Sequence, residues 1–352
     1  MTTKEKVLEI LTQNAENPVS GEKLAETCGI SRAAIWKAVK TLRDQGCNIE
    51  GTTNGGYVLH GTADIFSKDE VCRELCEFSQ DFSSLHVETF SVIDSTNTHA
   101  KRILSECGNL RLPDGSLTEA GQKYHKSVYI AESQTAGRGR LGRTFISPSK
   151  TGIYLTLIYA PEGGITNPAR LTALTGVAIC RVIKRLYDVE PSIKWINDIF
   201  VNHKKICGIL TEGSTNFETG TIESAIIGIG INISDNPEVF PPEVATIAGS
   251  IKGADNSAKT VTRSQLAAQV TGEVLKILEE DTASVMKEYK ALSFMIGQKV
   301  EVHPIIGDET SVYSATAIDI DDNAGLIVQV EDGSTKTLSS GEVSLHSANY
   351  GK

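Results

Sequence analysis

The strongest constraint on the fold is a glycine- and arginine-rich stretch, QTAGRGRLGR, at residues 134–143. Its glycines match G-x-G-x-x-G, the pattern that opens the first helix of a dinucleotide-binding domain. Residues 144–159 are instead rich in β-branched and aromatic side chains, which favours a loop followed by a strand. Because arginines lie between the glycines, the stretch predicts a loop that folds around a polyanion such as a triphosphate. The alternative is a solvated basic loop.

A second constraint lies in residues 1–60, which predict three short helices and a hairpin. Ser20 and Ser31 suit helix N-caps, and Gly29 suits the left-handed residue of a tight turn. The third helix has an apolar stripe opposite a basic face, and an Asn-Gly turn at 54–55 predicts a wing. This pattern predicts a winged helix-turn-helix whose DNA-binding residues fall within Gly21–Lys40, namely Arg32, Trp36, Lys37 and Lys40. The alternative is a three-helix protein-interaction module.

The charge distribution agrees with DNA binding by this first module. The chain has a net charge of −10, but its first sixty residues hold seven basic and seven acidic side chains and are neutral. Ser31 to Arg43 contains four basic residues and no acidic one. A local basic helix can bind a phosphate backbone even when the rest of the protein is acidic. Trp36, on the same face, either contacts a thymine methyl or sugar or packs against the wing.

Length and composition exclude several classes of protein. A chain of 352 residues, 40% hydrophobic, predicts two or three globular domains. No stretch reaches the roughly 18 to 20 apolar residues that a membrane span needs, and the N-terminus has no secretory pattern. The seven cysteines are scattered and never spaced C-x-x-C, which argues against disulfides and a zinc ribbon. We therefore expect a cytoplasmic protein with no membrane partner.

The rest of the chain mixes strands and helices. Periodicity predicts a connecting helix within 61–80, a Ser95-capped helix from Thr96 to Glu106 and a surface insertion over Cys107–Lys126. Strands are expected over 85–90 and 128–132, and Gly228–Asn232 is interpreted as a core strand. From Gln298 to Leu345, short strand-like runs alternate with turns.

Several motifs, in this order, resemble those of the bifunctional biotin–protein ligases that also repress the biotin operon. They are GEKLAETCGISRAAIWKAVKTLR at 21–43, DSTN at 94–97, QTAGRGRLGR at 134–143, KWIND at 194–198, KKICGIL at 204–210 and GIGIN at 228–232. The resemblance implies an α+β multidomain fold. Its parts are a winged helix-turn-helix (1–62), a central α/β class II synthetase-like biotin/lipoate ligase domain (63–294) and a C-terminal SH3-like β-barrel (295–352).

The same resemblance implies a two-step reaction and a regulatory role. Biotin and ATP, with Mg²⁺, would give biotinyl-5′-AMP, which then biotinylates a lysine of the biotin carboxyl carrier protein. The adenylate-bound chain would form a homodimer and repress biotin genes at operator DNA. In-line displacement at phosphorus needs chiefly positioning and fixed cations, which arginines and lysines supply.

The resemblance also assigns residues. The catalytic residues would be Lys205 and Arg140. The biotin-binding residues would be Ser95, Thr96, Asn97, Gln134, Arg138, Gly139, Arg140, Lys205 and Gly208. The residues for ATP or the adenylate would be Arg138, Arg140, Arg143, Lys194, Asn197 and Asp198. Short polar side chains at a strand-to-helix turn suit the hydrogen bonds of the ureido ring, and Gly208 would allow close backbone approach. For Lys194, a structural salt bridge to Asp198 is an equal alternative. No metal ligand is assigned.

Three positions depart from the family pattern. Ile196 replaces the usual proline, which predicts a looser turn, and Phe145 replaces a tryptophan that packs over the ligand. Thr316 stands where an arginine near the adenine is expected, which puts the ATP contribution of the C-terminal domain in question. Two other functions are alternatives: a ligand-sensing transcription factor with an inactive ligase domain, and a lipoate or octanoate ligase. Intact Lys205 and the arginine-glycine loop argue against the first. The GRGRLGR stretch and the DNA module argue against the second.

Overall fold

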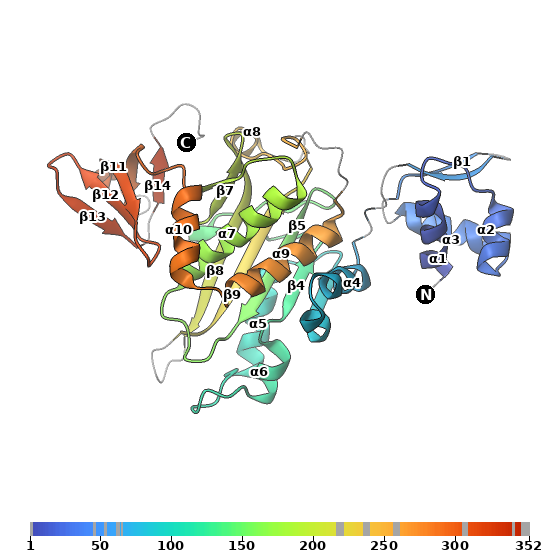
Figure 1. Cartoon of the computed structure of the whole chain (residues 1–352), viewed down its shortest axis with the longest axis horizontal. Helices are drawn as coiled ribbons and strands as arrows, with labels where there is room; N and C mark the ends of the chain where they lie inside the picture. Colours follow the sequence, from blue (N-terminus) through green and yellow to red (C-terminus); the bar gives the residue numbers. More distant parts are fainter. Residues whose placement is uncertain are drawn as a thin grey trace. The chain divides into compact units, whose positions relative to one another are not determined.

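The computed structural model describes residues 3–44, 47–52, 55–60, 64, 66–215, 222–234, 240–255, 261–304, 309–339 and 342–345. The chain divides into two compact units, one of residues 1–74 with 260–266 and the other of residues 75–259 with 267–352 (Figure 1). Among the described residues, no helix has the length and apolar character required to cross a membrane. The predicted domain boundaries at 62 and 294 stay predictions.

The first unit contains the predicted helix-turn-helix and hairpin. Its elements are α1 (Thr3–Gln13), α2 (Gly21–Cys28), α3 (Arg32–Asp44), β1 (Ile49–Thr52) and β2 (Gly56–Leu59). The Ser20 hydroxyl accepts from the Lys23 amide, and the Ser31 hydroxyl accepts from the Ala34 amide at 3.2 Å, so both predicted caps are confirmed. Gly29 has the left-handed φ of 67°. β1 and β2 pair antiparallel, while Asn54 of the predicted turn lies outside the described residues.

The apolar stripe of α3 forms the core of this unit. Ile35, Ala38, Val39 and Leu42 are buried against apolar residues of α1, α2 and the hairpin, which include Val7, Leu11, Leu24 and Leu59. Burial of this one face fixes which residues of α3 remain outside. The exposed residues of α3 are therefore those on the predicted basic face.

A seven-stranded mixed sheet organises the second unit. Its order is β3-β4-β5-β9-β8-β7-β6, and only the β3–β4 pair is parallel. The strands are β3 (Val87–Phe90), β4 (Val128–Ala131), β5 (Gly152–Tyr159), β6 (Ser192–Lys194), β7 (Asp198–Val201), β8 (Lys204–Thr215) and β9 (Ile222–Asn232). Strand β5, which the sequence predicted after the arginine-glycine loop, pairs along its whole length with β9.

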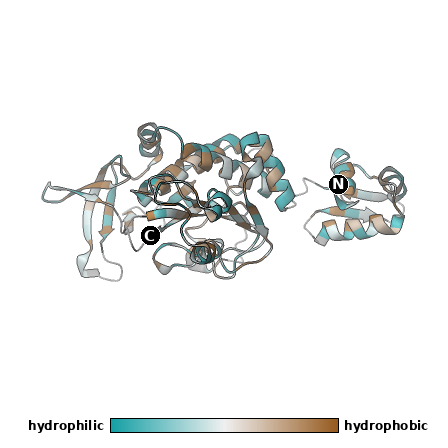
Figure 2. Ribbon diagram, turned by 90° about the horizontal axis from the view of Figure 1, so that it is seen from below, coloured by the Kyte–Doolittle hydropathy of each residue, from teal (hydrophilic) through white to brown (hydrophobic). Residues whose placement is uncertain are grey.

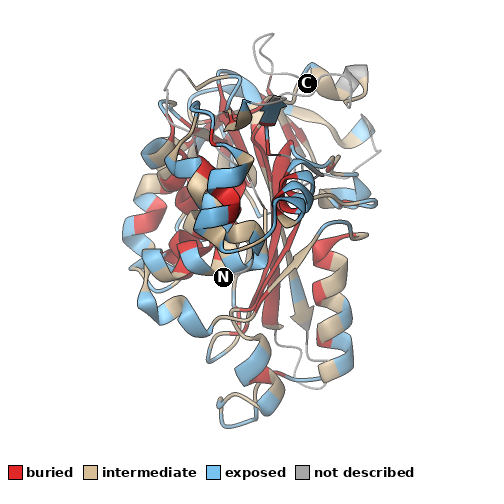
Figure 3. Cartoon of the chain, turned by 90° about the vertical axis from the view of Figure 1, so that its right-hand side faces the viewer, coloured by how far each residue is buried: buried red, intermediate tan, exposed pale blue. Residues whose placement is uncertain are grey.

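Helices cover the two faces of the sheet differently. α5 (Thr96–Cys107) contacts β4, β5 and β9, whereas α7 (Pro168–Leu186) contacts β7 and β8 and packs on α10 (Thr282–Leu292). Figure 3 shows buried residues concentrated in the strands and on parts of the helices, and Figure 2 shows both hydrophobic and hydrophilic residues along the helices. Side chains alternate along a strand, so Gly208 and Leu210 of β8 face one side and Cys207 and Ile209 the other.

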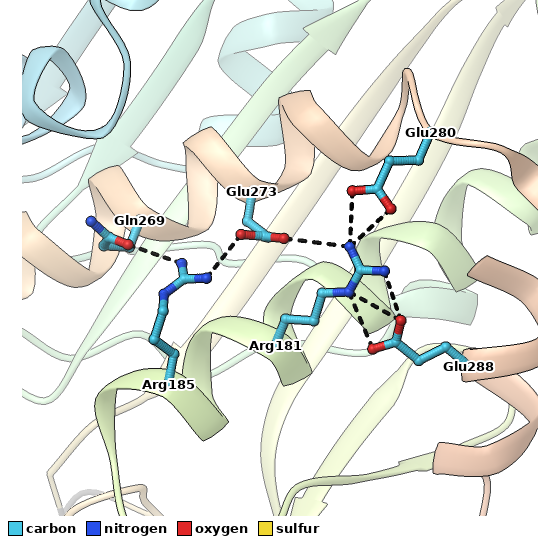
Figure 4. A network of polar contacts seen from close by, with 6 residues as sticks. All are labelled: Arg181, Arg185, Gln269, Glu273, Glu280 and Glu288. Atoms are coloured by element: carbon cyan, nitrogen blue, oxygen red, sulfur yellow. Dashed lines mark hydrogen bonds and ion pairs between the residues drawn. The ribbon is translucent and has the colours of Figure 1, made fainter. Parts of the chain in front are cut away.

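An ion-pair network joins the outer helices (Figure 4). Arg181 of α7 pairs with Glu288 of α10 at 2.7 Å and with Glu280 at 2.9 Å. Glu273 of α9 (Arg263–Ile277), 4% exposed at its side chain, accepts from Arg185 at 3.0 Å. The Glu273 side chain is nearly desolvated, so its charge would destabilise the fold if it were unpaired. Its arginine partners offset this cost. The network thus fixes the helical layer behind the sheet.

The predicted surface insertion is mostly exposed or half-buried, as expected, and its buried residues are Leu110 and Gly121. It contains α6 (Glu119–Tyr124), and Leu110, 2% exposed, packs with residues of α5 and the sheet such as Ala100 and Tyr129. Apolar residues lie among the glycines, prolines and charges of this segment, and they give it a hydrophobic anchor. The composition of the segment, rich in glycine, proline and charge, did not predict this anchor.

A second sheet forms the C-terminal part of the chain. Five antiparallel strands follow the order β13-β12-β11-β10-β14. They are β10 (Lys299–His303), β11 (Tyr313–Ile320), β12 (Leu326–Val330), β13 (Thr335–Leu338) and β14 (Glu342–Leu345). The predicted β-rich C-terminal module is confirmed. Short helices complete the chain: α4 (Lys68–Phe78), η1 (Gln80–Ser84), η2 (Arg140–Gly142), α8 (Pro242–Ala245) and η3 (Glu309–Ser311).

Candidate active site and DNA-binding face

One hollow on the α5 side of the central sheet gathers every residue that the sequence assigned to biotin or ATP. Those residues are Ser95, Thr96, Asn97, Gln134, Arg138, Gly139, Arg140, Arg143, Lys194, Asn197, Asp198, Lys205 and Gly208. They come from four separate segments of the chain. The lining also contains Phe145, which the sequence analysis placed over the ligand. The residues that the sequence did not assign are Leu141, Thr144, Tyr154, Leu155, Trp195, Ile209, Leu210, Gly228, Ile229, Gly230 and Val343.

A buried polar network lies at the start of α5. The Thr156 hydroxyl lies 2.7 Å from both the Thr96 hydroxyl and the Asn97 side-chain oxygen. The backbone amide of Thr96 donates to the Gln134 side-chain oxygen at 2.9 Å, and the Gln134 amide donates to Ser147 at 2.9 Å. These side chains have little freedom because each is held by another buried group. The network presents fixed polar groups to a ligand of mixed polarity.

Two glycines of β9 make room for this site. A Cβ at Gly228 would lie 2.1 Å from the Asn97 side-chain oxygen, and a Cβ at Gly230 would lie 2.5 Å from the ring of Phe145. The strand at Gly228–Asn232, interpreted from the sequence as a core strand, therefore also forms the floor of the hollow. Phe145, at the end of the arginine-glycine loop, packs edge-to-face on Tyr154 with ring centroids 6.2 Å apart. It keeps an aromatic wall at the expected place.

The arginine-glycine loop closes on itself as a short hairpin. The Gly139 amide donates to the Arg143 carbonyl at 2.7 Å, and the Phe145 amide donates to the Gly137 carbonyl at 2.9 Å. Leu141 and Gly142 at its tip have φ angles of 62° and 76°. Arg140 donates to the Asn197 side chain at 2.9 Å, so the loop is tied to the 194–198 turn. The context predicted for the glycines, a loop before a strand, is confirmed.

Lys205 and Asp198 form an ion pair at the other wall of the hollow. Lys205 Nζ lies 2.7 Å from Asp198 Oδ1, and the side chains are 30% and 20% exposed. Asn197 Nδ2 also donates to Asp198 Oδ1, at 2.8 Å. Both residues line the hollow, where a phosphate could replace the carboxylate as the partner of Lys205.

Glu212 of β8 is a residue that the sequence analysis missed. Its two carboxylate oxygens accept from Asn97 at 3.1 Å and from Lys101 at 2.7 Å, and Arg138 lies 3.4 Å away. The side chain is 20% exposed. One carboxylate therefore links the polar network of α5 to the arginine-glycine loop. Its alternation with Gly208 and Leu210 along β8 was the available signal.

The turn at 194–198 is tightly held. The Trp195–Ile196 peptide bond is cis, and the Ile196 carbonyl accepts from the buried Tyr289 hydroxyl at 3.1 Å. Burial raises the pKa of Tyr289 strongly, which keeps this hydroxyl protonated as a donor. Ile196 is only 5% exposed. The turn is therefore anchored at the position where the missing proline predicted looseness.

Two further expectations can be located in the fold. Thr316 lies within β11, paired with Lys299 and Gln329, and is not among the residues that line the hollow. The first residue of DSTN, Asp94, accepts from Arg102 at 2.7 Å, and this guanidinium holds the pKa of the carboxyl below its usual range. Among the described residues, no group of three or more His, Cys, Asp or Glu side chains is arranged to hold a metal ion.

The face of α3 predicted for DNA is open. Arg32, Lys37 and Lys40 are exposed, and Trp36 is 57% exposed. The Lys40 ammonium lies 5.6 Å from the centroid of the Trp36 ring. Trp36 is therefore not buried against the wing, which removes one of its two interpretations. This face of α3 therefore presents the exposed Trp36 ring beside three cationic side chains.

Three family models match the chain in sequence order. They are an HTH domain at residues 3–58, the biotin/lipoate A/B protein ligase family at 90–232 and the biotin protein ligase C-terminal domain at 296–346. The three segments correspond to the helix-turn-helix, the central sheet and the C-terminal sheet. Together they support the predicted fold class.

Relatives of known type match nearly the whole chain. A protein of Bacillus spizizenii named bifunctional ligase/repressor BirA is 30% identical over 346 residues, covering 96% of this chain and 97% of its own. The BirA protein of Escherichia coli is 30% identical over 333 residues, covering 94% and 93%. Among solved structures, the biotin protein ligase from Aquifex aeolicus in complex with biotin and ATP has a TM-score of 0.58 at 22% identity. It covers 75% of this chain and 99% of its own, and it supports the fold.

Proposed function

The chain belongs to the family of bifunctional biotin ligase/repressors, and from this premise we propose that it activates biotin and represses biotin genes. The ligase would form biotinyl-5′-AMP and biotinylate a lysine of the biotin carboxyl carrier protein. The observation that carries this proposal is the single hollow in which both predicted ligand sets meet, with Arg138, Arg140 and Lys205 around it. The ligase reaction needs ATP and repression needs operator DNA. The proposal therefore includes a cytoplasmic location, where both are present.

The first step forms one bond and breaks another at the α-phosphorus of ATP. A carboxylate oxygen of biotin attacks this phosphorus, and the bond to the β-phosphate oxygen breaks, releasing pyrophosphate. Charge accumulates on the phosphate oxygens, where Lys205, Arg138 and Arg140 supply fixed positive charge. The ureido ring would be bound by Ser95, Thr96, Asn97 and Gln134, whose polar groups are already held in place.

In the second step, the neutral amine of the carrier lysine attacks the acyl carbon of the adenylate. The carbon–oxygen bond to AMP breaks, AMP leaves, and the amine loses its proton to solvent. The α-phosphate of AMP would stay near the same cations that stabilised the first step. Arg140, which donates to Asn197, would contact that phosphate.

Mg²⁺ is expected with ATP because it neutralises the triphosphate when bound. This ion commonly binds through one or two carboxylates together with substrate phosphates and water. Asp198 is the carboxylate that lines the described part of the hollow. The donor set therefore fits an ion that arrives with the nucleotide, and Asp198 would hold it.

A substitution of Lys205 tests the ligase proposal. Lys205→Gln removes one phosphate-facing charge, and we expect formation of the adenylate to fall by about 10²-fold. Lys204→Gln is the matched control, because Lys204 is adjacent on β8 but binds the Thr246 carbonyl and does not line the hollow. Measurement of biotin-dependent pyrophosphate release compares them. Equal rates in the two variants would remove Lys205 from the mechanism.

We also propose that α3 binds operator DNA and that two chains bind together as a homodimer when adenylate is bound. Two-fold symmetric helix-turn-helix pairs read two half-sites. Arg32, Lys37 and Lys40 would contact phosphates, and Trp36 would lie against a sugar or a thymine methyl. The exposed Trp36 ring and the exposed cationic side chains of α3 support this assignment.

The DNA proposal predicts a change in salt dependence. Lys37→Ala should weaken binding of a biotin-gene operator fragment and lower the slope of log affinity against log salt by about 1 per chain. Lys6→Ala on α1, which is exposed and lies outside the Gly21–Lys40 segment, serves as the control. Titrations at several salt concentrations give both slopes. An unchanged slope in Lys37→Ala would exclude this lysine from phosphate contact.

A further inference from the structure

A turn of the C-terminal sheet is held in one shape by its own first residue. The Asp321 turn, residues 321–325, joins β11 to β12. The Asp321 side-chain oxygen accepts from the amides of Asn323 at 2.9 Å and Gly325 at 2.7 Å. The Asp321 amide donates back to the Gly325 carbonyl at 2.8 Å. Ala324 is fully buried and has a left-handed φ of 63°, so the carboxylate holds a shape that alanine alone disfavours.

This turn contacts the active-site motif directly. The Trp195 indole N–H donates to the Ala324 carbonyl at 2.7 Å, and Trp195 is 4% exposed. Asn167, at the N-cap of α7, donates to the neighbouring Asn323 carbonyl at 2.9 Å. A buried indole N–H without a partner is unfavourable, so the ring direction of Trp195 depends on where Ala324 presents its carbonyl.

Trp195 belongs to the turn that carries the proposed ATP residues. Lys194 precedes it, and Asn197 and Asp198 follow, and all four residues line the hollow. The biotin end of the hollow is held differently, by the network of Thr156, Asn97 and Gln134. A change in the direction of Trp195 should therefore act on the nucleotide end first.

We propose that Asp321 is a positioning residue for nucleotide binding, acting through the Ala324 carbonyl on Trp195 and the 194–198 turn. Asp321 does not line the hollow. The inference rests on the proposed ligase function for the identity of the ligand. The effect of Asp321 on the direction of the Trp195 ring does not depend on that function. It gives the C-terminal sheet a role at the nucleotide end although Thr316 is not in the hollow.

Two readouts on the full-length chain test this inference. The first is the KM for ATP and for biotin in pyrophosphate exchange. The second is tryptophan fluorescence: the chain has two tryptophans, so Trp36→Phe leaves Trp195 as the sole emitter. Asp321→Ala removes the acceptor, Asp321→Asn keeps an oxygen acceptor, and Asp322→Ala is the matched control. Asp322 is adjacent and exposed, and its replacement changes the charge equally.

The expected result separates nucleotide from biotin. In Asp321→Ala, weakening of the Trp195–Ala324 hydrogen bond, equivalent to about one hydrogen bond at the nucleotide end, should raise the KM for ATP about fivefold and leave the KM for biotin within about twofold. Trp195 emission should shift to longer wavelength. Asp321→Asn should restore both readouts toward wild type, and Asp322→Ala should match wild type in both.

Other results overturn the inference. It fails if Asp321→Ala matches Asp322→Ala in both readouts, or if both KM values rise together. If circular dichroism shows that Asp321→Ala does not fold, Trp195→Phe, which removes the N–H donor and the five-membered ring but keeps an aromatic side chain, must give the same selective rise for ATP. If wild-type protein catalyses no exchange, the ligase proposal fails. Fluorescence of Asp321→Ala and Asp321→Asn then still decides whether the turn holds Trp195.

Discussion

At the scale of single residues, the site could be predicted where its residues lie in compact motifs. Ser95, Arg140 and Lys205 each stand in a short stretch with an unusual composition, and they meet in one hollow. Glu212 could not be found in this way. Its partners Asn97, Lys101 and Arg138 lie 115, 111 and 74 positions away in sequence. Such contacts follow from strand order and not from local pattern.

Glu212 leads to a prediction at this scale. Glu212→Gln leaves an oxygen for Asn97 but removes the counterion of Lys101 and Arg138, so the loop loses its link to α5. We expect the KM for biotin to rise about fivefold with a smaller change in kcat. Steady-state kinetics with biotin as the varied substrate check this.

The control for Glu212 is Glu279→Gln, which removes a single exposed ion pair to Lys126 away from the hollow. That variant should match wild type. A Glu212→Gln enzyme with the same biotin KM as Glu279→Gln would show that the carboxylate does not position the site.

At the scale of elements, local chemistry predicted α2, α3 and the wing well. N-cap serines, a left-handed glycine and helical periodicity act within a few residues, so the sequence contains all that they need. The 107–126 segment shows the limit. Its glycines and charges indicate a loop, but Leu110 is buried by packing against Ala100 and Tyr129, which are distant strand and helix residues. The glycines of β9 are likewise explained only by the side chains of Asn97 and Phe145, which pack against them from other parts of the chain.

The wing provides a pH prediction. His60 follows β2 and its ring nitrogens lie 2.9 Å from Glu16 and 3.0 Å from Glu50. Hydrogen bonds to Glu16 and Glu50 raise the pKa of His60 above 6.5. Because the folded pKa is raised, the stabilisation is fully present below the unfolded pKa and is lost as pH rises through the folded pKa.

We therefore expect the amides of β1 and β2 to be better protected at pH 6 than at pH 8, after correction for intrinsic exchange rates. Hydrogen exchange with mass spectrometry measures this. In His60→Gln the difference should disappear. A pH difference of the same size in that variant would rule out His60 as its source.

At the scale of the whole chain, the sequence predicted three kinds of structure in the right order, and family models match each. It could not predict that the C-terminal sheet reaches the hollow. Val343 of β14 lines it, and the Ala324 carbonyl holds Trp195. These contacts depend on how two sheets pack, which no local pattern encodes. Thr316, which stands where an arginine is expected, lies within β11 and is not among the residues that line the hollow.

The central claim is that this chain adenylates biotin, and exchange of labelled pyrophosphate into ATP tests it most directly. The purified full-length protein would be assayed with Mg²⁺ and biotin, with lipoate, and with no acid. We predict exchange with biotin only, because attack by the biotin carboxylate on the α-phosphorus is reversible. Exchange with lipoate alone, or no exchange with either acid, would contradict the claim.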